Sequence, residues 1–452
     1  NRVIEKAFRG SAPAQINVPR DYWTQVIDIE LPPIVRFERQ GGGKEAIENA
    51  AKLLSKAKFP VILSGAGVVL GGAIDECKKL AEKLDAPVCN GYQHNDSFPG
   101  SHPLAVGPLG YNGSKAAMEL ISKADVVLAL GTRLNPFSTL PGYGIDYWPK
   151  KATIIQVDMN PDRIGLTKKV SVGICGDAKQ VAQQILDKLS SDAGNTGREE
   201  RKNLIHKTKS AWLQTLSGLD HEEDDPGTVW NKEARERDKD RMSPRQAWRA
   251  IQDALPQDAI ISSDIGNNCA IGNAYPTFEK PRKYLAPGLF GPCGYGFPAI
   301  LGAKIGCPDT PVVGFAGDGA FGISMNEMSS CAREEWPAIT MVIFRNYQWG
   351  AEKRNSILWF DDNFVGTELD PELSYAKVAN ACGLKGVTCK TMEETTKAIK
   401  QSCEDQKKGI TTFIEIILNQ ELGEPFRRDA MKKPVKVAGI KKEDMKPQKS
   451  LV

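Results

Sequence analysis

Residues 310–320 read TPVVGFAGDGA, a short apolar run that ends in the turn Gly317-Asp318-Gly319. An uninterrupted run of apolar and β-branched residues predicts a strand that is buried on both faces, as in parallel sheets. A second apolar run covers residues 338–344, and a helical pattern lies between the two runs. This order predicts a doubly wound α/β sheet, in which Asp318 and Asn346 follow two strands at the same edge. Ligands of open α/β sheets bind at that edge.

Asp318 and Asn346 combine a carboxylate with a side-chain amide, and both groups offer hard oxygen donors. Magnesium takes about six oxygen ligands and is usually held by one or two carboxylates together with phosphate oxygens. The pair therefore predicts a Mg²⁺ ion that holds a diphosphate cofactor. Gly317 and Gly319 would let the backbone approach a phosphate closely. Taken alone, Gly-Asp-Gly also fits a turn in which Asp318 only caps a helix.

The first half of the chain shows the same alternation of helical and apolar segments. Short apolar runs cover residues 59–63, 86–89, 125–131 and 153–158, with helical patterns between them. This alternation predicts another doubly wound parallel sheet. The turn Gly65-Ala66-Gly67 suggests a dinucleotide site, but the third glycine and the acidic partner of that motif have no clear match. A purely structural turn is the favoured interpretation, and nucleotide binding stays the alternative.

Composition bounds the remaining possibilities. The 452 residues carry a net charge of +3, with 41% hydrophobic and 25% charged residues, which is typical of a globular protein and gives no support for nucleic-acid binding. No apolar stretch is long enough to span a bilayer. The ten cysteines are dispersed without a Cys-x-x-Cys pair, so we expect reduced thiols in the cytoplasm. Four histidines without ligand spacing argue against a zinc enzyme.

Three segments together resemble the signature of thiamine-diphosphate (ThDP) enzymes. Beside the Gly-Asp-Gly turn and Asn346, residues 260–268 resemble the strand and loop that hold the terminal phosphate, and residues 291–299 resemble the glycine-rich turn beneath the cofactor. The resemblance implies a backbone carbonyl of Gln348 as the third protein ligand of Mg²⁺, after Asp318 and Asn346. It implies the following cofactor-binding residues: Asn267, Asn268, Gly291, Cys293, Gly317, Asp318, Gly319, Ala320 and Asn346.

One position departs from that signature. A large hydrophobic residue lies beneath the bent cofactor in many ThDP enzymes, whereas the matching residue here is Cys293. Cysteine packs as a small hydrophobe. Either the pocket is wider, or Phe290 and Tyr295 fill it, and Cys293 fits an inert thiol equally well.

The segments 289–297, 345–355 and 419–431 resemble, more closely, the sulfoacetaldehyde acetyltransferase family. That resemblance implies conversion of 2-sulfoacetaldehyde and phosphate to acetyl phosphate and sulfite by a homodimer or homotetramer. Since both substrates are anions, the site needs cations. The candidates are Lys353, Arg354, Arg427 and Arg428, for which ordinary surface charge is the alternative. Another ThDP carboligase or decarboxylase of the acetolactate-synthase type, or a non-catalytic ThDP-binding protein, stays open as an alternative function.

Composition and resemblance together divide the chain into six segments. Residues 25–43 are rich in Pro and Gly and form a linker, while 193–241 form a connector whose charges we expect to face water. From Asn419 onward we expect a polar tail draped over the surface. The expected segments are a remnant of an N-terminal pyrimidine-binding domain (1–24), the linker (25–43), a central Rossmann-like domain (44–192), the charged connector (193–241), the ThDP diphosphate- and Mg²⁺-binding domain (242–420) and the tail (421–452).

The expected remnant includes a strand near residues 14–18. In related enzymes a glutamate of the pyrimidine domain hydrogen-bonds the cofactor's aminopyrimidine, and no segment here matches that domain's core. We therefore assign no catalytic side chain within these 452 residues. The corresponding prediction is that this chain alone has little or no turnover.

Overall fold

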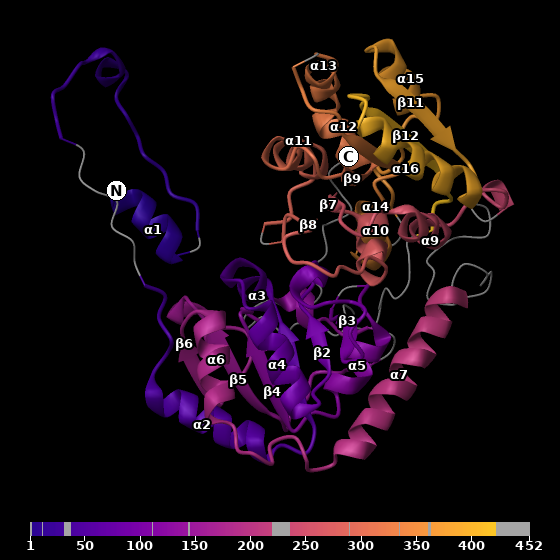
Figure 1. The fold of residues 1–452 in the computed structure, drawn as a ribbon. Coiled ribbons are helices and arrows are strands. Elements are labelled where there is room, and N and C mark those ends of the chain that lie inside the picture. The colour runs from indigo at the N-terminus through magenta and orange to yellow at the C-terminus, as the bar shows by residue number, and fades with distance from the viewer. Residues whose placement is uncertain are drawn as a thin grey trace.

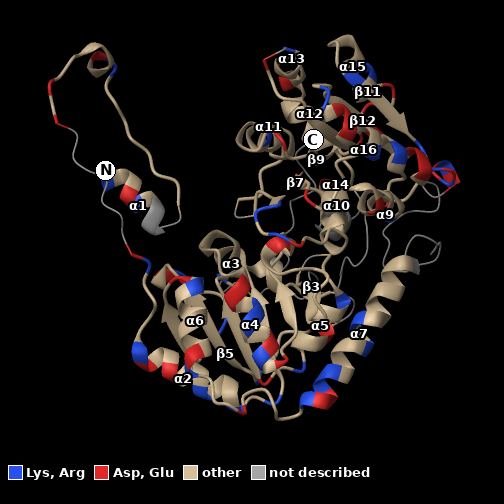
Figure 2. Cartoon of the chain, viewed as in Figure 1, with Lys and Arg blue, Asp and Glu red and all other residues tan. Residues whose placement is uncertain are grey.

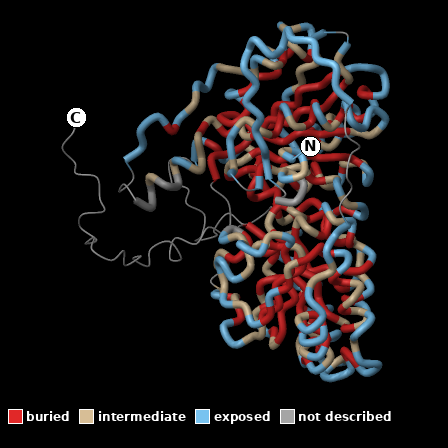
Figure 3. Tube along the Cα trace, turned by 90° about the vertical axis from the view of Figure 1, so that its left-hand side faces the viewer, coloured by how far each residue is buried: buried red, intermediate tan, exposed pale blue. Residues whose placement is uncertain are grey.

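The computed structural model describes residues 2–10, 12–30, 38–110, 112–142, 145–218, 236–288, 290–333, 335–359 and 363–421. The chain forms two lobes, one above the other in Figure 1, and each lobe contains a six-stranded parallel sheet. Buried residues concentrate in the middle of each lobe (Figure 3). The expected fold class, two doubly wound α/β sheets, is confirmed. None of the helices in the described ranges has the length and apolar character needed to cross a membrane.

The first sheet has the strand order β3-β2-β1-β4-β5-β6. Its strands are β1 (Pro60–Ser64), β2 (Val88–Asn90), β3 (Ala105–Pro108), β4 (Val126–Leu130), β5 (Thr153–Asp158) and β6 (Val172–Cys175). Its helices are α2 (Lys44–Lys56), α3 (Ala66–Gly71), α4 (Ile74–Leu84), α5 (Lys115–Ile121) and α6 (Ala178–Lys188). Every residue of β1 and β4 is buried, as the uninterrupted apolar runs predict.

The strand order of this sheet reverses between β1 and β4, where open α/β sheets bind nucleotides. Here the segments that follow β1 and β4 are in direct backbone contact, because the Gly67 N–H donates to the Gly131 carbonyl at 2.8 Å. A Cβ atom added to Gly67 would come within 2.7 Å of the Gly131 Cα. The Gly65-Ala66-Gly67 turn therefore serves close loop packing, in line with the structural interpretation of that turn.

The second sheet has the strand order β11-β12-β10-β9-β7-β8. Its strands are β7 (Ile260–Ser263), β8 (Tyr284–Leu285), β9 (Val312–Gly317), β10 (Thr340–Arg345), β11 (Lys385–Cys389) and β12 (Thr412–Ile417). Its helices are α9 (Pro244–Ala254), α10 (Asn267–Ile271), α11 (Gly296–Gly306), α12 (Asp318–Ser324), α13 (Met328–Cys331), α14 (Gly350–Trp359), α15 (Tyr375–Ala381) and α16 (Met392–Gln406). The order reverses between β7 and β9, so the carboxyl ends of β7, β9 and β10 share one edge at the switch point.

A buried tryptophan supports this edge from inside the lobe. Trp248 of α9 packs against Phe315 and Phe344, with ring centroids 4.8 and 5.3 Å apart. Its indole N–H donates to the Asn268 carbonyl at 2.6 Å, so one side chain contacts β9, β10 and α10. The capping box of Ser243 and Gln246 starts α9, where Pro244 is the first helical residue.

The two lobes meet in a seam of buried polar contacts. The Asn95 side-chain amide donates to the carbonyls of Asn273 and Pro276, both at 2.9 Å. Asp96 accepts the backbone N–H groups of Lys283 and Tyr284 at 3.0 and 3.3 Å. The seam therefore fixes the loop after β2 against the strand β8 of the other lobe.

The connector between the lobes contains α7 (Arg198–Gly218), which runs along one side of the molecule (Figure 1). Arg201, 1% exposed, donates five hydrogen bonds to backbone carbonyls, three in the first lobe and two in the connector itself. Asp238 is also fully buried and pairs with Arg237 and Arg241. The expectation that the connector's charges face water is wrong at these two residues, because each charge has several partners inside the protein.

The N-terminal segment lies apart from both lobes in Figure 1. It contains α1 (Arg2–Gly10) and a 3₁₀ turn at Arg20–Thr24. The strand expected near residues 14–18 does not form within the described residues.

Candidate active site

Asp318 lies at the carboxyl end of β9, where it starts α12. Its carboxylate is 1% exposed and fully engaged with protein donors. Oδ1 accepts the Gly319 N–H at 3.0 Å, and Oδ2 accepts the Tyr347 N–H at 2.6 Å and an N–H of Arg345 at 3.1 Å. These contacts fix the direction of the carboxylate.

Asn346 follows β10 and is 2% exposed. The residues on both of its sides, Arg345 and Tyr347, contact the Asp318 carboxylate, so the structure brings the predicted pair together across adjacent strands. Tyr347 has φ +62°, a conformation that costs about 1–3 kcal/mol outside glycine and that clusters at ligand sites. The backbone therefore reverses sharply at Asn346.

The chain after this reversal pairs with a later segment. The Trp349 N–H donates to the Thr367 carbonyl at 2.7 Å, and the Leu369 N–H donates to the Tyr347 carbonyl at 2.9 Å. These two bonds flank Gln348 and do not use its carbonyl, to which no backbone N–H of another loop donates within the described part of the chain. The Gln348 side chain is buried and donates to the Gln420 carbonyl at 3.0 Å.

The loop after β7 carries Asn267 and Asn268, both 4% exposed, at the start of α10. Gly266 has φ +130°, a conformation that only glycine adopts readily, and a Cβ atom there would meet nothing within 4 Å. Among the described residues, the buried Oδ1 atom of Asn268 has no hydrogen-bond partner. The loop thus offers open space and a free acceptor beside the first N–H groups of a helix.

The glycine-rich turn lies against this loop through Asp264. The buried Asp264 carboxylate accepts the N–H groups of Ile265, Gly294 and Gly296 at 2.7, 3.1 and 2.7 Å. A Cβ atom on Gly294 would lie 3.0 Å from Ile323 of α12 and 3.8 Å from the Ala320 carbonyl. Asp264 therefore joins the loop after β7, the turn near Gly291 and Cys293, and α12 at one edge.

Burial raises the pKa of Asp318 to about 6, although the Arg345 charge and the backbone N–H groups oppose the rise. Burial also raises the pKa of Asp264, although backbone N–H groups oppose the rise. It raises the pKa of the Cys293 thiol as well, so this cysteine is not an activated nucleophile. Burial destabilises the charged form of a carboxylate, and a bound cation offsets this cost. A buried carboxylate is therefore suited to ligate a metal ion.

These residues fit a magnesium diphosphate. One carboxylate, one amide and one free carbonyl form an oxygen-donor set, and Mg²⁺ takes its remaining ligands from phosphate and water. Within the described ranges no group of three or more His, Cys, Asp or Glu residues is placed to hold a metal. The open space beside Gly266 and Gly317 leaves room for the phosphates.

The predicted substrate cations have different surroundings. The Lys353 ammonium lies 2.5 Å from Glu368 Oε1 and 3.3 Å from Gln420 Oε1, so its charge already has a carboxylate partner. Arg354 is in α14. Arg427 and Arg428 lie outside the described residues.

Three residues of the site were not predicted from the sequence. Arg345 and Asp264 each contact several segments of the site, and Gln420 donates to Glu368 and accepts from Gln348 and Lys353. Residues Asn419–Glu421 are about 4% exposed, so the expectation of a surface tail is wrong for them. A signal was present only for Arg345, a charged residue at the end of an apolar strand beside Asn346.

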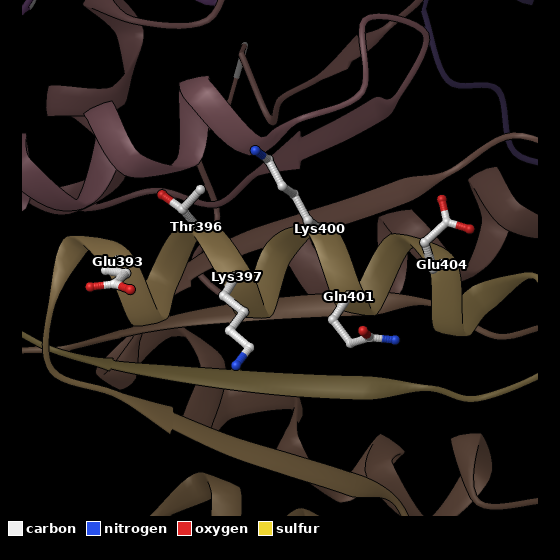
Figure 4. A pocket seen from close by; sticks show the side chains of 6 residues that line it. All are labelled: Glu393, Thr396, Lys397, Lys400, Gln401 and Glu404. Atoms are coloured by element: carbon white, nitrogen blue, oxygen red, sulfur yellow. The ribbon is translucent and has the colours of Figure 1, made fainter.

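Two other surface features lie away from this edge. A hollow of about 510 Å³ on α16 is lined by Glu393, Thr396, Lys397, Lys400, Gln401 and Glu404 (Figure 4). Its residues project from a single helix and carry both charges, without a buried polar group aimed at a ligand. Figure 2 shows both charge signs interspersed along α4, α6 and α7, as expected from the small net charge.

Comparison with known proteins gives two family matches. Residues 47–185 match the central domain of thiamine pyrophosphate enzymes, and residues 264–416 match their C-terminal TPP binding domain. A benzoylformate decarboxylase from Polynucleobacter necessarius has the same fold, with a TM-score of 0.68 at 19% identity over 90% of this chain and 70% of that chain.

Several curated relatives are much more similar in sequence. A probable sulfoacetaldehyde acetyltransferase of Rhizobium meliloti (strain 1021) is 77% identical over 100% of this chain and 76% of the relative. The sulfoacetaldehyde acetyltransferase of Roseovarius nubinhibens is 75% identical over 99% of this chain and 74% of the relative. A probable acetolactate synthase large subunit of Methanocaldococcus jannaschii is 29% identical over 86% and 64%. The chain thus spans about three quarters of the length of its closely similar relatives.

Proposed function

This chain belongs to the sulfoacetaldehyde acetyltransferases within the thiamine pyrophosphate enzymes, and we propose that it holds thiamine diphosphate through Mg²⁺ at the carboxyl edge of its second sheet. It is a ThDP-dependent transferase, and its reaction is the conversion of 2-sulfoacetaldehyde and phosphate to acetyl phosphate and sulfite. The observation that supports the site is that the residues on both sides of Asn346, at the end of β10, contact the buried Asp318 carboxylate at the end of β9.

Each group at this edge has a task that its chemistry suits. Asp318, the Asn346 amide and the Gln348 carbonyl would ligate Mg²⁺. Asn267 and Asn268, with Gly317, Gly319 and Ala320, would line the diphosphate at two helix starts. Gly291 and Cys293 would support the cofactor rings, and the small thiol leaves more room there than a large hydrophobe would.

When bound, thiamine diphosphate supplies the electron sink that lets the carbon–sulfur bond of the substrate break. The chain's own residues orient the cofactor and enclose it. Both substrates are anions, so N–H groups and cations near the edge would hold them. Lys353, Arg354, Arg427 and Arg428 remain our candidates, and Lys353 would have to exchange Glu368 for the anion.

We further propose a homodimer or homotetramer located in the cytoplasm. The ten cysteines are all free thiols, which supports a reducing compartment. Size-exclusion chromatography coupled to light scattering would give the oligomeric state directly.

The activity test uses the protein expressed from its complete reading frame. We expect sulfite release from sulfoacetaldehyde only with phosphate, ThDP and Mg²⁺ present, and little acetolactate from pyruvate. Asp318→Ala should abolish sulfite release and weaken Mn²⁺ binding in the presence of ThDP. Faster turnover of pyruvate than of sulfoacetaldehyde would contradict the proposed reaction, while undiminished metal binding in Asp318→Ala would contradict the proposed site.

A further inference from the structure

Arg345 is a buried cation directly beside the proposed metal ligands. It is the last residue of β10, is 0% exposed, and precedes Asn346 in the chain. A fully buried guanidinium is costly unless charges and hydrogen bonds compensate it. Its surroundings should therefore show what it holds in place.

The guanidinium contacts two carboxylates and two carbonyls. One terminal nitrogen donates to Asp318 Oδ2 at 3.1 Å, and the other donates to the carbonyls of Leu373, at 2.9 Å, and Asp370. Its Nε lies 3.7 Å from Glu415 of β12. Arg345 thus connects β9, β12 and the segment before α15 with its own strand.

Two aromatic rings fix the plane of the guanidinium. The Tyr347 ring centroid lies 4.2 Å from the Arg345 Cζ atom, and the Tyr375 centroid lies 5.4 Å away. Tyr347 also donates its N–H to Asp318 Oδ2, and the Tyr375 hydroxyl donates to the Asp318 carbonyl. The two rings that restrain the arginine are therefore tied to the same aspartate.

Together these contacts mean that Asp318 Oδ2 is occupied by hydrogen-bond donors of the protein. Oδ2 receives two N–H groups, from Arg345 and Tyr347, whereas Oδ1 receives only the N–H of the neighbouring Gly319. A carboxylate held in this way presents the same oxygen to a cation in every molecule, which lowers the entropy lost on binding. A lysine could not reproduce the arrangement, because its ammonium is a point charge without the planar fork.

We propose that Arg345 is a positioning residue that holds the Asp318 carboxylate in the orientation required for the metal–diphosphate complex. The proposal rests on the proposed ThDP site. The proposal differs from two other roles of Arg345. In one, Arg345 only attaches residues 370–373 to the sheet; in the other, its positive charge lowers the affinity of the site for the metal ion.

The test measures binding of Mn²⁺, used in place of Mg²⁺, to the full-length protein with saturating ThDP by electron paramagnetic resonance. We expect the Mn²⁺ Kd of Arg345→Lys to rise about tenfold, with the metal still bound. Arg241→Lys is the matched control, since Arg241 lies over the same Tyr347 ring at 4.7 Å but pairs with Asp238. Its Mn²⁺ Kd should stay within about twofold of the original protein.

If Arg345→Lys does not fold, the comparison is repeated in the background of Glu415→Gln. That substitution removes the second buried carboxylate beside Arg345. The double variant Arg345→Lys/Glu415→Gln is then compared with Glu415→Gln alone, and the same rise of about tenfold is expected. An unchanged Kd with a lowered melting temperature would make Arg345 merely structural, and a tighter Kd would indicate repulsion; either result overturns the proposal. Undiminished Mn²⁺ binding in Asp318→Ala would instead contradict the ThDP site itself.

Discussion

Individual side chains at the edge of the second sheet are fixed mainly by backbone groups. The Asp264 carboxylate accepts three backbone N–H groups, and the Asp318 carboxylate accepts two together with the Arg345 guanidinium. Hydrogen bonds to a charged group contribute about 1.5–3 kcal/mol each, so each carboxylate holds several segments together. A side chain with few partners therefore gives a test of ligand binding that folding affects least.

Lys353 has few partners and is suited to such a test. If it binds a substrate anion, Lys353→Met should raise KM for sulfoacetaldehyde or phosphate about tenfold and leave kcat nearly unchanged. Glu368→Gln should lower the same KM, because it frees the ammonium that now lies 2.5 Å away. Steady-state kinetics of both variants decide the matter, and an unchanged KM in each would remove Lys353 from the site.

His94 gives a pH-dependent prediction. Burial and the nearby Arg133 charge lower the pKa of His94 to about 4. Because its pKa in the folded state is below the unfolded value of about 6.5, stability present above pH 6.5 is lost as pH falls toward 4. Solvent reaches part of the ring, so we expect a contribution of about 2 kcal/mol.

The measurement for His94 is urea unfolding at pH 7.0 and pH 4.5. The original protein should lose more stability between these values than His94→Gln, by about the 2 kcal/mol above. Equal losses in the two proteins would mean that His94 titrates normally in the folded state.

At the scale of whole elements, one buried arginine connects α7 to the loops around it. The charged residues of α7 lie between Arg198 and Lys209, and Arg201 connects the helix to carbonyls at the C-terminal end of α4 and at residues 194 and 196. Arg201→Met should destabilise the protein by about 3 kcal/mol, because five carbonyls, of Asp85, Lys58, Thr196, Leu84 and Gly194, lose this donor at once and the last two bonds are fully buried. Hydrogen exchange should show faster exchange in α7, with urea unfolding giving the energy.

Lys202→Met serves as the control for α7. Lys202 is the next residue and makes only half-exposed ion pairs with Asp85 and Glu199. Its removal should change stability by less than about 0.5 kcal/mol. Similar exchange in both variants would show that α7 is held by packing rather than by Arg201.

At the scale of the whole molecule, the seam between the lobes decides whether they unfold together. Asn95 and Asp96 provide four hydrogen bonds across it, three of them fully buried. Asn95→Ala leaves the carbonyls of Asn273 and Pro276 without this donor, which weakens the coupling between the two sheets.

Differential scanning calorimetry checks this coupling. We expect the melting transition of Asn95→Ala to broaden or split in two, with the first component several degrees lower. Ser101→Ala, which removes an exposed contact to Glu279 on the same seam, should melt like the original protein. A single unchanged transition in Asn95→Ala would show that the lobes do not depend on this contact.

The sequence by itself determined the two parallel sheets and the placement of Asp318 and Asn346 at one edge. An uninterrupted apolar run indicates that a strand is buried on both faces. This information is local to each run, so β9 and β10 could be predicted closely. The motif also predicted that Asp318 and Asn346 would share an edge. Short elements such as β8 carry too few residues for a pattern, and the strand expected near residues 14–18 has no neighbour among the described residues to pair with.

Only the tertiary structure decided which residues complete the site. The register that sets Phe344 beside Gly317 brings Arg345 against Asp318, although 27 positions separate the two in the chain. In the same way, Gln420 reaches Gln348 because β12 lies next to β10. The hydrophobic pattern of the sequence indicates whether a residue is buried. Which residue it contacts depends on strand order and register, and these are set only when the whole sheet assembles.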